Sequence, residues 1–256
     1  MVSKNTIKLI KSLAIKKYRL KEGRFLVEGD KNVLEVLNSQ YQTEQLFATN
    51  HFIEENKRSC KNALTIQEAE PDEIKKMSLL QNPQNCLAVC KLPETPVFPE
   101  ELTNNLSLYL DDIQDPGNLG TIIRICDWFG IGYLFCSPGT VDFYNPKVIQ
   151  ASMGSFCRVK MVKSSFSEVE LLANNSQTQI FGAFLEGENV YKKELPQKAI
   201  LVMGNEGNGI KKSLEKQIPA KIKIPGFSEK SSGAESLNVS VATAILCSEF
   251  KRQTFY

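Results

Sequence analysis

The sequence predicts an α/β protein of two domains, the second built on a mostly parallel sheet. Its 256 residues suffice for two ordinary domains, and the hydrophobic fraction of 42% is that of a globular protein. Short apolar runs alternate with amphipathic segments in both halves, as strands do with helices. Three prolines within residues 93–99 interrupt this alternation and indicate a linker. We therefore expect domains at residues 1–92 and 104–256, joined by a linker at 93–103.

The N-terminal domain is expected to be a small alternating unit. Apolar residues recur at helical spacing over residues 3–17, and Val33, Leu34 and Leu37 mark one face of a second helix. A third helix begins near Pro71, because proline is well suited to a first helical turn. The strands expected in this domain lie at residues 25–29, 45–49 and 87–90.

Positive charge is concentrated at the start of the chain. Between Lys4 and Arg24 there are eight basic residues and one acid, Glu22. A cationic face of this kind suits a polyanion such as RNA, although a solvated lysine-rich helix is the alternative. The basic residues are Lys4, Lys8, Lys11, Lys16, Lys17, Arg19, Lys21 and Arg24.

The second domain alternates strands and helices more regularly, which favours a parallel sheet covered on both faces. Asn145-Pro146 is expected to open one of its helices, with proline in the first turn. The expected strands are 106–110, 133–136, 158–162, 180–185, 199–203 and 220–224. The expected helices are 119–129, 145–151, 166–173, 210–217 and 237–250.

Several classes of protein are disfavoured by composition. The sequence contains no run of 18 apolar residues, so we expect no membrane span, and the N-terminus lacks the apolar core of a signal peptide. The seven cysteines are odd in number and form no C-x-x-C pair, so we expect reduced thiols in a cytoplasmic protein. The single histidine, His51, has no partners of metal-ligand type, so we expect no metal site.

Three glycine-bearing blocks follow predicted strands of the second domain, where ligands bind in open α/β sheets. The first block runs from Asp111 to Arg124. Its Pro116-Gly117 pair predicts a turn, and Asn118 can cap the following helix. Arg124 lies among apolar neighbours, which suits a guanidinium that clamps a phosphate; pairing with Asp115 or Asp127 is the alternative.

The second block is Gly204-Asn205-Glu206-Gly207-Asn208-Gly209. Three glycines in six residues allow the chain to bend back and present backbone amides, but the P-loop pattern is absent. Glu206 would repel a pyrophosphate and better suits a cationic ligand or helix N–H groups. A plain tight turn is the alternative.

The third block begins at Ile224-Pro225 and continues from Glu235 to Ala242. Ser236 or Asn238 can cap the apolar helix that follows. An ordinary capped C-terminal helix would explain the same residues.

In this order the blocks resemble those of the SpoU (TrmH-type) RNA 2′-O-ribose methyltransferases, of the SPOUT superfamily. The matching elements are Asn118-x-Gly120-x-x-x-Arg124, Gly204-x-Glu206-x-x-Gly209 and Glu235-Ser236-Leu237-Asn238 through Ala242. Residues 145–158 are similar to the family's middle segment, and residues 17–29 and 81–84 to its N-terminal L30e-like substrate-binding domain. The resemblance implies a deep trefoil knot, bound S-adenosylmethionine and a homodimer joined by the knot helices.

The resemblance also implies roles for individual residues. The catalytic centre would comprise Asn118, Arg124, Glu206, Ser236 and Asn238. The cofactor would be bound by Gly204, Asn205, Gly209, Ile224, Leu237 and Asn238. Independently of the resemblance, the basic cluster at the start of the chain is expected to contact RNA through Lys16, Lys17, Arg19 and Arg24.

One departure from the family pattern is the longer segment between Pro225 and Gly233, which affects the cofactor's outer contacts. We expect a ribose methyltransferase acting on ribosomal or transfer RNA. The alternatives are a non-catalytic RNA-binding or ribosome-assembly factor on the same fold, and an RNA base methyltransferase.

Overall fold

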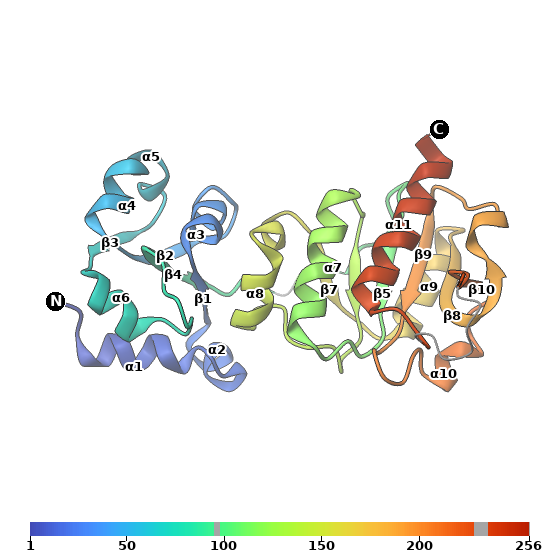
Figure 1. Ribbon diagram of the computed structural model, residues 1–256, viewed down its shortest axis with the longest axis horizontal. Coiled ribbons are helices and arrows are strands. Elements are labelled where there is room, and N and C mark those ends of the chain that lie inside the picture. Colours follow the sequence, from blue (N-terminus) through green and yellow to red (C-terminus); the bar gives the residue numbers. More distant parts are fainter. Residues whose placement is uncertain (95–97, 228–234, 256) are drawn as a thin grey trace. The chain divides into compact units, whose positions relative to one another are not determined.

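The computed structural model describes residues 1–94, 98–227 and 235–255 (Figure 1). The chain divides into two compact units, each considered by itself below. The first comprises Met1–Thr95 together with Asp142–Arg158, and the second comprises Pro96–Val141 with Val159–Tyr256. Within the described ranges, no helix is long and apolar enough to cross a membrane.

The first unit contains a four-stranded mixed sheet with the order β1-β4-β2-β3. Strand β4 runs antiparallel to β1 and β2, whereas β2 and β3 are parallel. The strands are β1 (Arg24–Glu28), β2 (Thr43–Ala48), β3 (Thr65–Glu68) and β4 (Cys86–Lys91). The helices are α1 (Lys4–Ser12), α2 (Lys16–Glu22), α3 (Asp30–Leu37), α4 (Asn50–Glu55), α5 (Lys57–Cys60) and α6 (Pro71–Met77).

The single N-terminal helix expected over residues 3–17 is wrong, because the chain forms two helices there. Leu13 is fully buried beside Ile10 and ends α1, and Ile15 takes an extended conformation that starts α2. Gly23, at φ 63°, then ends α2 in the left-handed region that glycine adopts without strain. Because the chain breaks at the buried Leu13, the basic residues that follow it lie on a separate helix, α2, and not on a continuation of α1.

Residues 142–158 fold onto the first unit, although they lie between two strands of the second unit in the sequence. They include α8 (Pro146–Ser152) and a 3-10 turn at Ser155–Cys157. Four aromatic rings, with centroids 4.8–6.3 Å apart, join this segment to the sheet. They belong to Phe25, Tyr41, Tyr144 and Phe156. In addition, Asn32 Nδ2 donates to Gln150 Oε1 over 3.1 Å.

The second unit contains a six-stranded sheet in which every pairing is parallel, with the order β10-β8-β9-β5-β6-β7. This confirms the mostly parallel sheet expected from the alternating pattern. The strands are β5 (Ser107–Leu110), β6 (Leu134–Cys136), β7 (Met161–Lys163), β8 (Gln179–Asn189), β9 (Ala199–Met203) and β10 (Ala220–Lys223). The helices are α7 (Pro116–Trp128), α9 (Phe166–Asn175), α10 (Lys212–Glu215), α11 (Val239–Phe255) and a 3-10 turn at Val190–Lys192.

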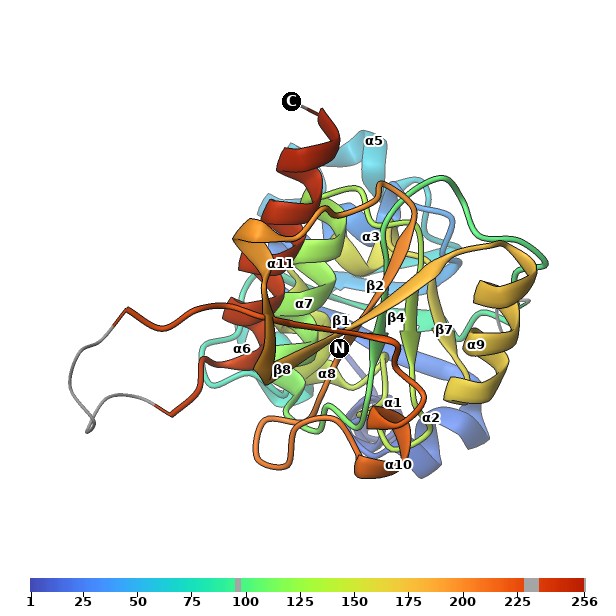
Figure 2. The ribbon, with the colours of Figure 1, turned by 90° about the vertical axis from the view of Figure 1, so that its right-hand side faces the viewer.

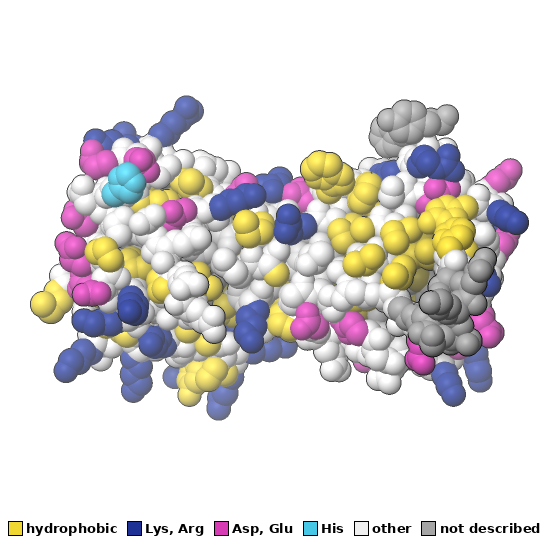
Figure 3. Space-filling model, in the orientation of Figure 1, with side chains coloured by type: hydrophobic (Ala, Val, Ile, Leu, Met, Phe, Trp, Pro, Cys, Tyr) yellow, Lys and Arg dark blue, Asp and Glu magenta, His cyan; other side chains and the backbone are white. Residues whose placement is uncertain are grey.

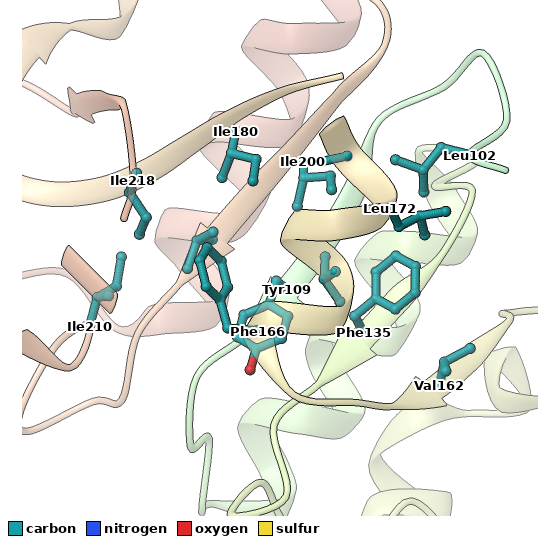
Figure 4. Packing of buried hydrophobic residues seen from close by; sticks show 13 residues of the cluster. Leu102, Tyr109, Phe135, Val162, Phe166, Leu172, Ile180, Ile200, Ile210 and Ile218 are labelled. Carbon is teal, nitrogen blue, oxygen red and sulfur yellow. The ribbon is translucent and has the colours of Figure 1, made fainter. Parts of the chain in front are cut away.

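Helices cover both faces of this sheet: α7 and α11 lie on one side and α9 on the other (Figure 2). Strands β5 and β9 are buried along their whole length, as expected of central strands. Figure 4 shows Tyr109 of β5 and Phe135 of β6 in one cluster with Phe166, the first residue of α9; the rings of Tyr109 and Phe166 meet edge to face at 5.2 Å. On the other side, Phe181 of β8 meets Phe250 of α11 in the same way at 5.3 Å.

The strand order positions a site. After β5 the chain adds β6 and then β7 on one side of β5. The strand on the other side of β5 is β9, which belongs to the half of the sheet that ends in β10. Such a reversal leaves room for a ligand beyond the carboxyl ends of the two strands at the switch. The first two glycine-bearing blocks follow these two strands, β5 and β9.

Candidate functional site

Residues from all three blocks meet through one chain of hydrogen bonds. Asn238 Nδ2 donates to Asn118 Oδ1 over 2.9 Å, and Asn118 Nδ2 donates to Glu206 Oε1 over 2.9 Å. Glu206 and Asn238 are exposed to solvent, and Asn118 is partly buried. The structure thus brings together three of the residues assigned to the catalytic centre, although they come from segments about 90 and 120 residues apart in the sequence.

Helix caps hold two of these asparagines in place. Asp115, rather than Asn118, caps α7: its Oδ1 accepts from the Asn118 backbone N–H over 2.8 Å, and Pro116 occupies the first turn. The capping role expected for Asn118 is therefore wrong, and its side chain is left to reach across to the other blocks. Asn238 does cap α11, since its Oδ1 accepts from the backbone N–H and the hydroxyl of Ser240 at 2.9 and 2.6 Å.

The second block is a closed loop held by Asn205. Backbone bonds in both directions join Asn205 and Gly209, at 3.0 and 2.9 Å. The Asn205 side chain accepts from the N–H groups of Gly207 and Asn208 at 2.9 and 3.1 Å, and donates to the Asp112 carbonyl at 2.8 Å. A Cβ on Gly204 would stand 2.2 Å from backbone atoms of Gly209 and Ile210, so only glycine fits there.

An ion-pair cluster that the sequence analysis did not identify braces the base of this loop. Asp112 has φ 55°, and its carboxylate accepts from Ser137 Oγ at 2.6 Å and Lys211 Nζ at 2.5 Å. Asp111, which is 1% exposed, accepts from the Lys211 backbone N–H at 2.8 Å. Burial raises the pKa of the Asp112 carboxyl, but the hydrogen bonds from Lys211 and Ser137 outweigh burial and lower the pKa overall. Asp112, the second of two acids that follow β5, is thus a non-glycine residue in the strained left-handed region, which the sequence alone did not indicate.

Arg124 lies on α7 with its side chain exposed, next to the fully buried Ile122 and Ile123. It makes no hydrogen bond or ion pair with any residue of the described ranges, so pairing with Asp115 or Asp127 does not occur among them. Its guanidinium therefore keeps all its donors for a ligand.

Two residues assigned to the cofactor, Ile224 and Leu237, and one assigned to the catalytic centre, Ser236, do not join this network. Ile224 follows β10 and is partly buried, and Ser236 and Leu237 immediately precede the α11 cap, with Leu237 48% exposed. Of the long segment after Pro225, residues 228–234 lie outside the described residues.

The basic residues assigned to RNA differ in their environments. Lys16 and Lys17 are exposed. Arg24 is partly exposed and pairs with Glu44 at 2.5 Å. Arg19 is only 2% exposed: it donates to the carbonyls of Leu13 and Ala14 and to Asp142, so its assignment to RNA is wrong. Four of its five N–H donors are bonded to protein acceptors, and the buried side chain cannot reach a phosphate outside the protein.

Comparison with known proteins gives a consistent result for both parts of the chain. Residues 105–248 match the sequence profile of the SpoU rRNA Methylase family, and residues 4–88 match that of the MRM3-like substrate binding domain. The chain is 30% identical over 241 residues to the Bacillus subtilis protein named 23S rRNA (guanosine(2553)-2′-O)-methyltransferase RlmP, and the match covers 92% of each chain.

Two solved structures cover nearly the whole chain. One is a putative RNA methyltransferase of the TrmH family from Porphyromonas gingivalis, with 38% identity, a TM-score of 0.87 and 99% coverage of both chains. The other is an AdoMet-bound rRNA methyltransferase from Sinorhizobium meliloti, with a TM-score of 0.86 over 100% of this chain and 98% of that one. At 24% identity, the second likeness is one of fold alone.

Proposed function

This chain belongs to the SpoU rRNA Methylase family, and we propose that its S-adenosylmethionine-dependent 2′-O-ribose methylation acts on 23S ribosomal RNA. The observation that carries the catalytic assignment is the hydrogen-bonded series Asn238–Asn118–Glu206, which joins all three family blocks at one place. The choice of 23S RNA rests on the B. subtilis relative, which matches 92% of both chains. A base methyltransferase is disfavoured because that relative is named for ribose methylation.

The residues around the network suit a cationic cofactor with an adenosine moiety. When bound, S-adenosylmethionine supplies a methyl group on a positively charged sulfur. Glu206 offers an exposed carboxylate for that charge, and Lys211, the cation at the base of the loop, is already neutralised by Asp112. We propose that Gly204, Asn205, Gly209, Ile224 and Leu237 hold the cofactor, mainly through backbone groups, with the half-exposed Leu237 side chain covering an apolar face.

The catalytic residues divide into orienting and charge-stabilising groups. Asn118, Glu206 and Asn238 fix one another and so present a preorganised polar surface to the ribose. Ser236, exposed just before the α11 cap, is assigned to the same surface. We assign Arg124 no role as a base, because a guanidinium offers hydrogen-bond donors and no acceptor. We assign to it the binding of the substrate phosphate and the stabilisation of negative charge developing on the 2′-oxygen.

The proposal is tested with the full-length chain, unmethylated 23S RNA and S-adenosylmethionine carrying a labelled methyl group. Nuclease digestion and mass spectrometry should find the label on a ribose 2′-oxygen. Arg124→Ala should abolish transfer while calorimetry gives a cofactor affinity within a few-fold of the parent, since Arg124 lies outside both cofactor segments. Label on a base, or cofactor binding with no transfer to any ribosomal RNA, would refute the proposal; the second result would favour an assembly factor.

We further propose that the protein is a homodimer formed through α7 and α11. These two helices pack side by side, and Trp128, at the end of α7, is 85% exposed, while Val241 of α11 is 47% exposed. Hydrophobic side chains gather over this pair of helices (Figure 3). An exposed tryptophan on such a face is typical of an interface. Light scattering at micromolar concentration should give a dimer mass, and Trp128→Asp should give a monomer.

Family membership supports three further parts of the proposal. The C-terminal segments should form the family's trefoil knot, and the protein should act in the cytoplasm, where ribosomes are assembled. The substrate-binding and catalytic roles should divide at residues 93–103. In the substrate-binding part, Lys16 and Lys17 should contact RNA phosphates, with Arg24 contributing only if it leaves Glu44.

A further inference from the structure

Helix α2 turns its apolar residues outward. Ile15, Tyr18 and Leu20 are 55%, 39% and 65% exposed, whereas a short surface helix ordinarily buries such side chains. The only buried residue of α2 is Arg19. The helix is therefore attached to the protein through a guanidinium instead of through an apolar stripe.

The contacts of Arg19 explain how α2 can be held in this inverted orientation. Its Nη1 donates to the carbonyls of Leu13 and Ala14 at 2.7 and 2.9 Å. Its Nη2 and Nε donate to Asp142 Oδ2 at 2.6 and 3.2 Å. These bonds satisfy the carbonyls at the α1–α2 break and tie the helix to the segment 142–158. Four charge-assisted or buried bonds replace the apolar packing that α2 lacks.

Lysines surround the exposed apolar residues. Lys16, Lys17 and Lys21 are all exposed, and so are Lys4, Lys8 and Lys11 of the neighbouring α1. The one acid of α2, Glu22, lies at its end and is partly buried. Figure 3 shows basic and hydrophobic side chains intermingled over α1 and α2. The charge of this surface complements a polyanion, and its apolar groups complement the flat faces of unpaired bases.

We propose that α2 is a contact surface for unpaired nucleotides of the RNA substrate. Tyr18 stacks on one base, Leu20 packs against a neighbouring base or ribose, and Lys16, Lys17 and Lys21 bind the adjoining phosphates. A base-paired helix would use only the lysines, because its base faces are hidden within the stack. This inference rests on RNA being the substrate, and it adds that the substrate-binding unit recognises a single-stranded loop or end.

The test compares Tyr18→Ala with the parent in the full-length chain, by fluorescence anisotropy. The probes are a labelled 12-nucleotide RNA without self-complementarity and the blunt duplex of the same sequence. Stacking on an aromatic side chain contributes about 1–3 kcal/mol per base, so Tyr18→Ala should weaken single-strand binding by about tenfold. Binding to the duplex should change less than twofold. Tyr18→Phe should bind as the parent does, since stacking needs the ring and not the hydroxyl.

Two further variants separate stacking from charge and from general effects. Tyr191→Ala removes a tyrosine of similar exposure, 46%, from the other unit and should leave single-strand binding unchanged. Lys16→Ala combined with Lys17→Ala should reduce the salt slope of single-strand binding by about 1.4, at about 0.7 for each phosphate that is no longer neutralised. Tyr18→Ala should leave that slope unchanged.

The inference is overturned if Tyr18→Ala binds the single strand as tightly as the parent, or if it weakens duplex binding equally. Cofactor affinity, measured by calorimetry, and methyl transfer to intact 23S RNA are recorded for the same variants. If the parent transfers methyl groups normally while Tyr18→Ala loses no single-strand affinity, the α2 assignment fails and the proposed activity stands. If the parent transfers none, the proposed function itself fails.

Discussion

The side chain of Asn205 holds the loop that we assign to the cofactor, and its removal should weaken cofactor binding without unfolding the protein. Asn205→Ala deletes three hydrogen bonds, to the N–H groups of Gly207 and Asn208 and to the Asp112 carbonyl. The backbone pair between Asn205 and Gly209 would remain. The variant therefore loosens the loop without removing any group that the cofactor's backbone contacts need.

The magnitude follows from those three bonds. At about 1 kcal/mol each, they contribute about 3 kcal/mol to the ordered form of the loop. Asn205 is only partly buried, so water recovers some of this, and about 2 kcal/mol is a reasonable loss. If the cofactor binds only the ordered loop and the loop of the free protein is mostly open, the dissociation constant should rise by up to about 30-fold.

Isothermal titration calorimetry with S-adenosylmethionine measures this effect, and Asn208→Ala is the matched control. Asn208 lies in the same loop, and its side chain makes no hydrogen bond within the described part of the chain. The control should bind the cofactor within about twofold of the parent, and both variants should show nearly the parent melting temperature. Equal affinities for the two alanine variants would refute the assignment of the Asn205 loop to the cofactor.

Three further perturbations test other parts of the structure. Arg19→Met should lower the urea unfolding free energy by about 3 kcal/mol, because it leaves Asp142 and two carbonyls without their donor, and Arg19→Lys should recover little of it. Burial raises the pKa of the Glu28 carboxyl, so this group stabilises the folded state at a pH below the ordinary carboxyl pKa. That stabilisation is lost as the pH rises from the ordinary pKa through the raised one. Over the same pH range, the melting temperature of Glu28→Gln should therefore increase relative to that of the parent. Gly204→Ala should weaken cofactor binding more than Gly207→Ala, whose Cβ would have its nearest neighbour at 3.7 Å.

The local structure of the three glycine-bearing blocks was predictable because its signals are local. A turn, a helix cap and a tight loop each depend on a few consecutive residues, and the parallel sheet follows from alternating apolar runs. The expectation that Asn118, Glu206 and Asn238 share one place came from the family resemblance. The strand order explains only part of it, because β5 and β9 are adjacent whereas β8 separates β9 from β10, the strand before the third block. Asp112, Ser137 and Lys211 were missed because their contacts join residues 25 to about 100 positions apart, and no short pattern marks such pairs.

Other elements were missed because their sequences carry weak periodicity. Helices α4 and α5 are only six and four residues long, and all four residues of β3 are exposed. Short segments of this kind are fixed by tertiary contacts rather than by their own apolar pattern. The packing of 142–158 against the first unit was equally invisible, because its aromatic and polar partners lie more than 100 residues earlier.

Arg19 shows that the residues of a basic run in a sequence can differ in role, some anchoring the fold and others remaining available to a ligand. Within residues 4–24 the lysines of α1 and α2 are exposed, while both arginines, Arg19 and Arg24, are engaged by carboxylates. A guanidinium offers five donors in a planar fork and can satisfy several fixed acceptors at once, whereas a strongly hydrated ammonium gains less from burial. An arginine that interrupts a run of lysines is thus a candidate for an internal anchor, and the lysines around it are candidates for the ligand. Here the anchor's partner, Asp142, lies in a segment inserted between β6 and β7 of the catalytic sheet. The RNA-binding surface that we propose on α2 would therefore depend on residues encoded within the second half of the chain, and deleting that segment should disturb RNA binding even though it carries none of the proposed RNA contacts.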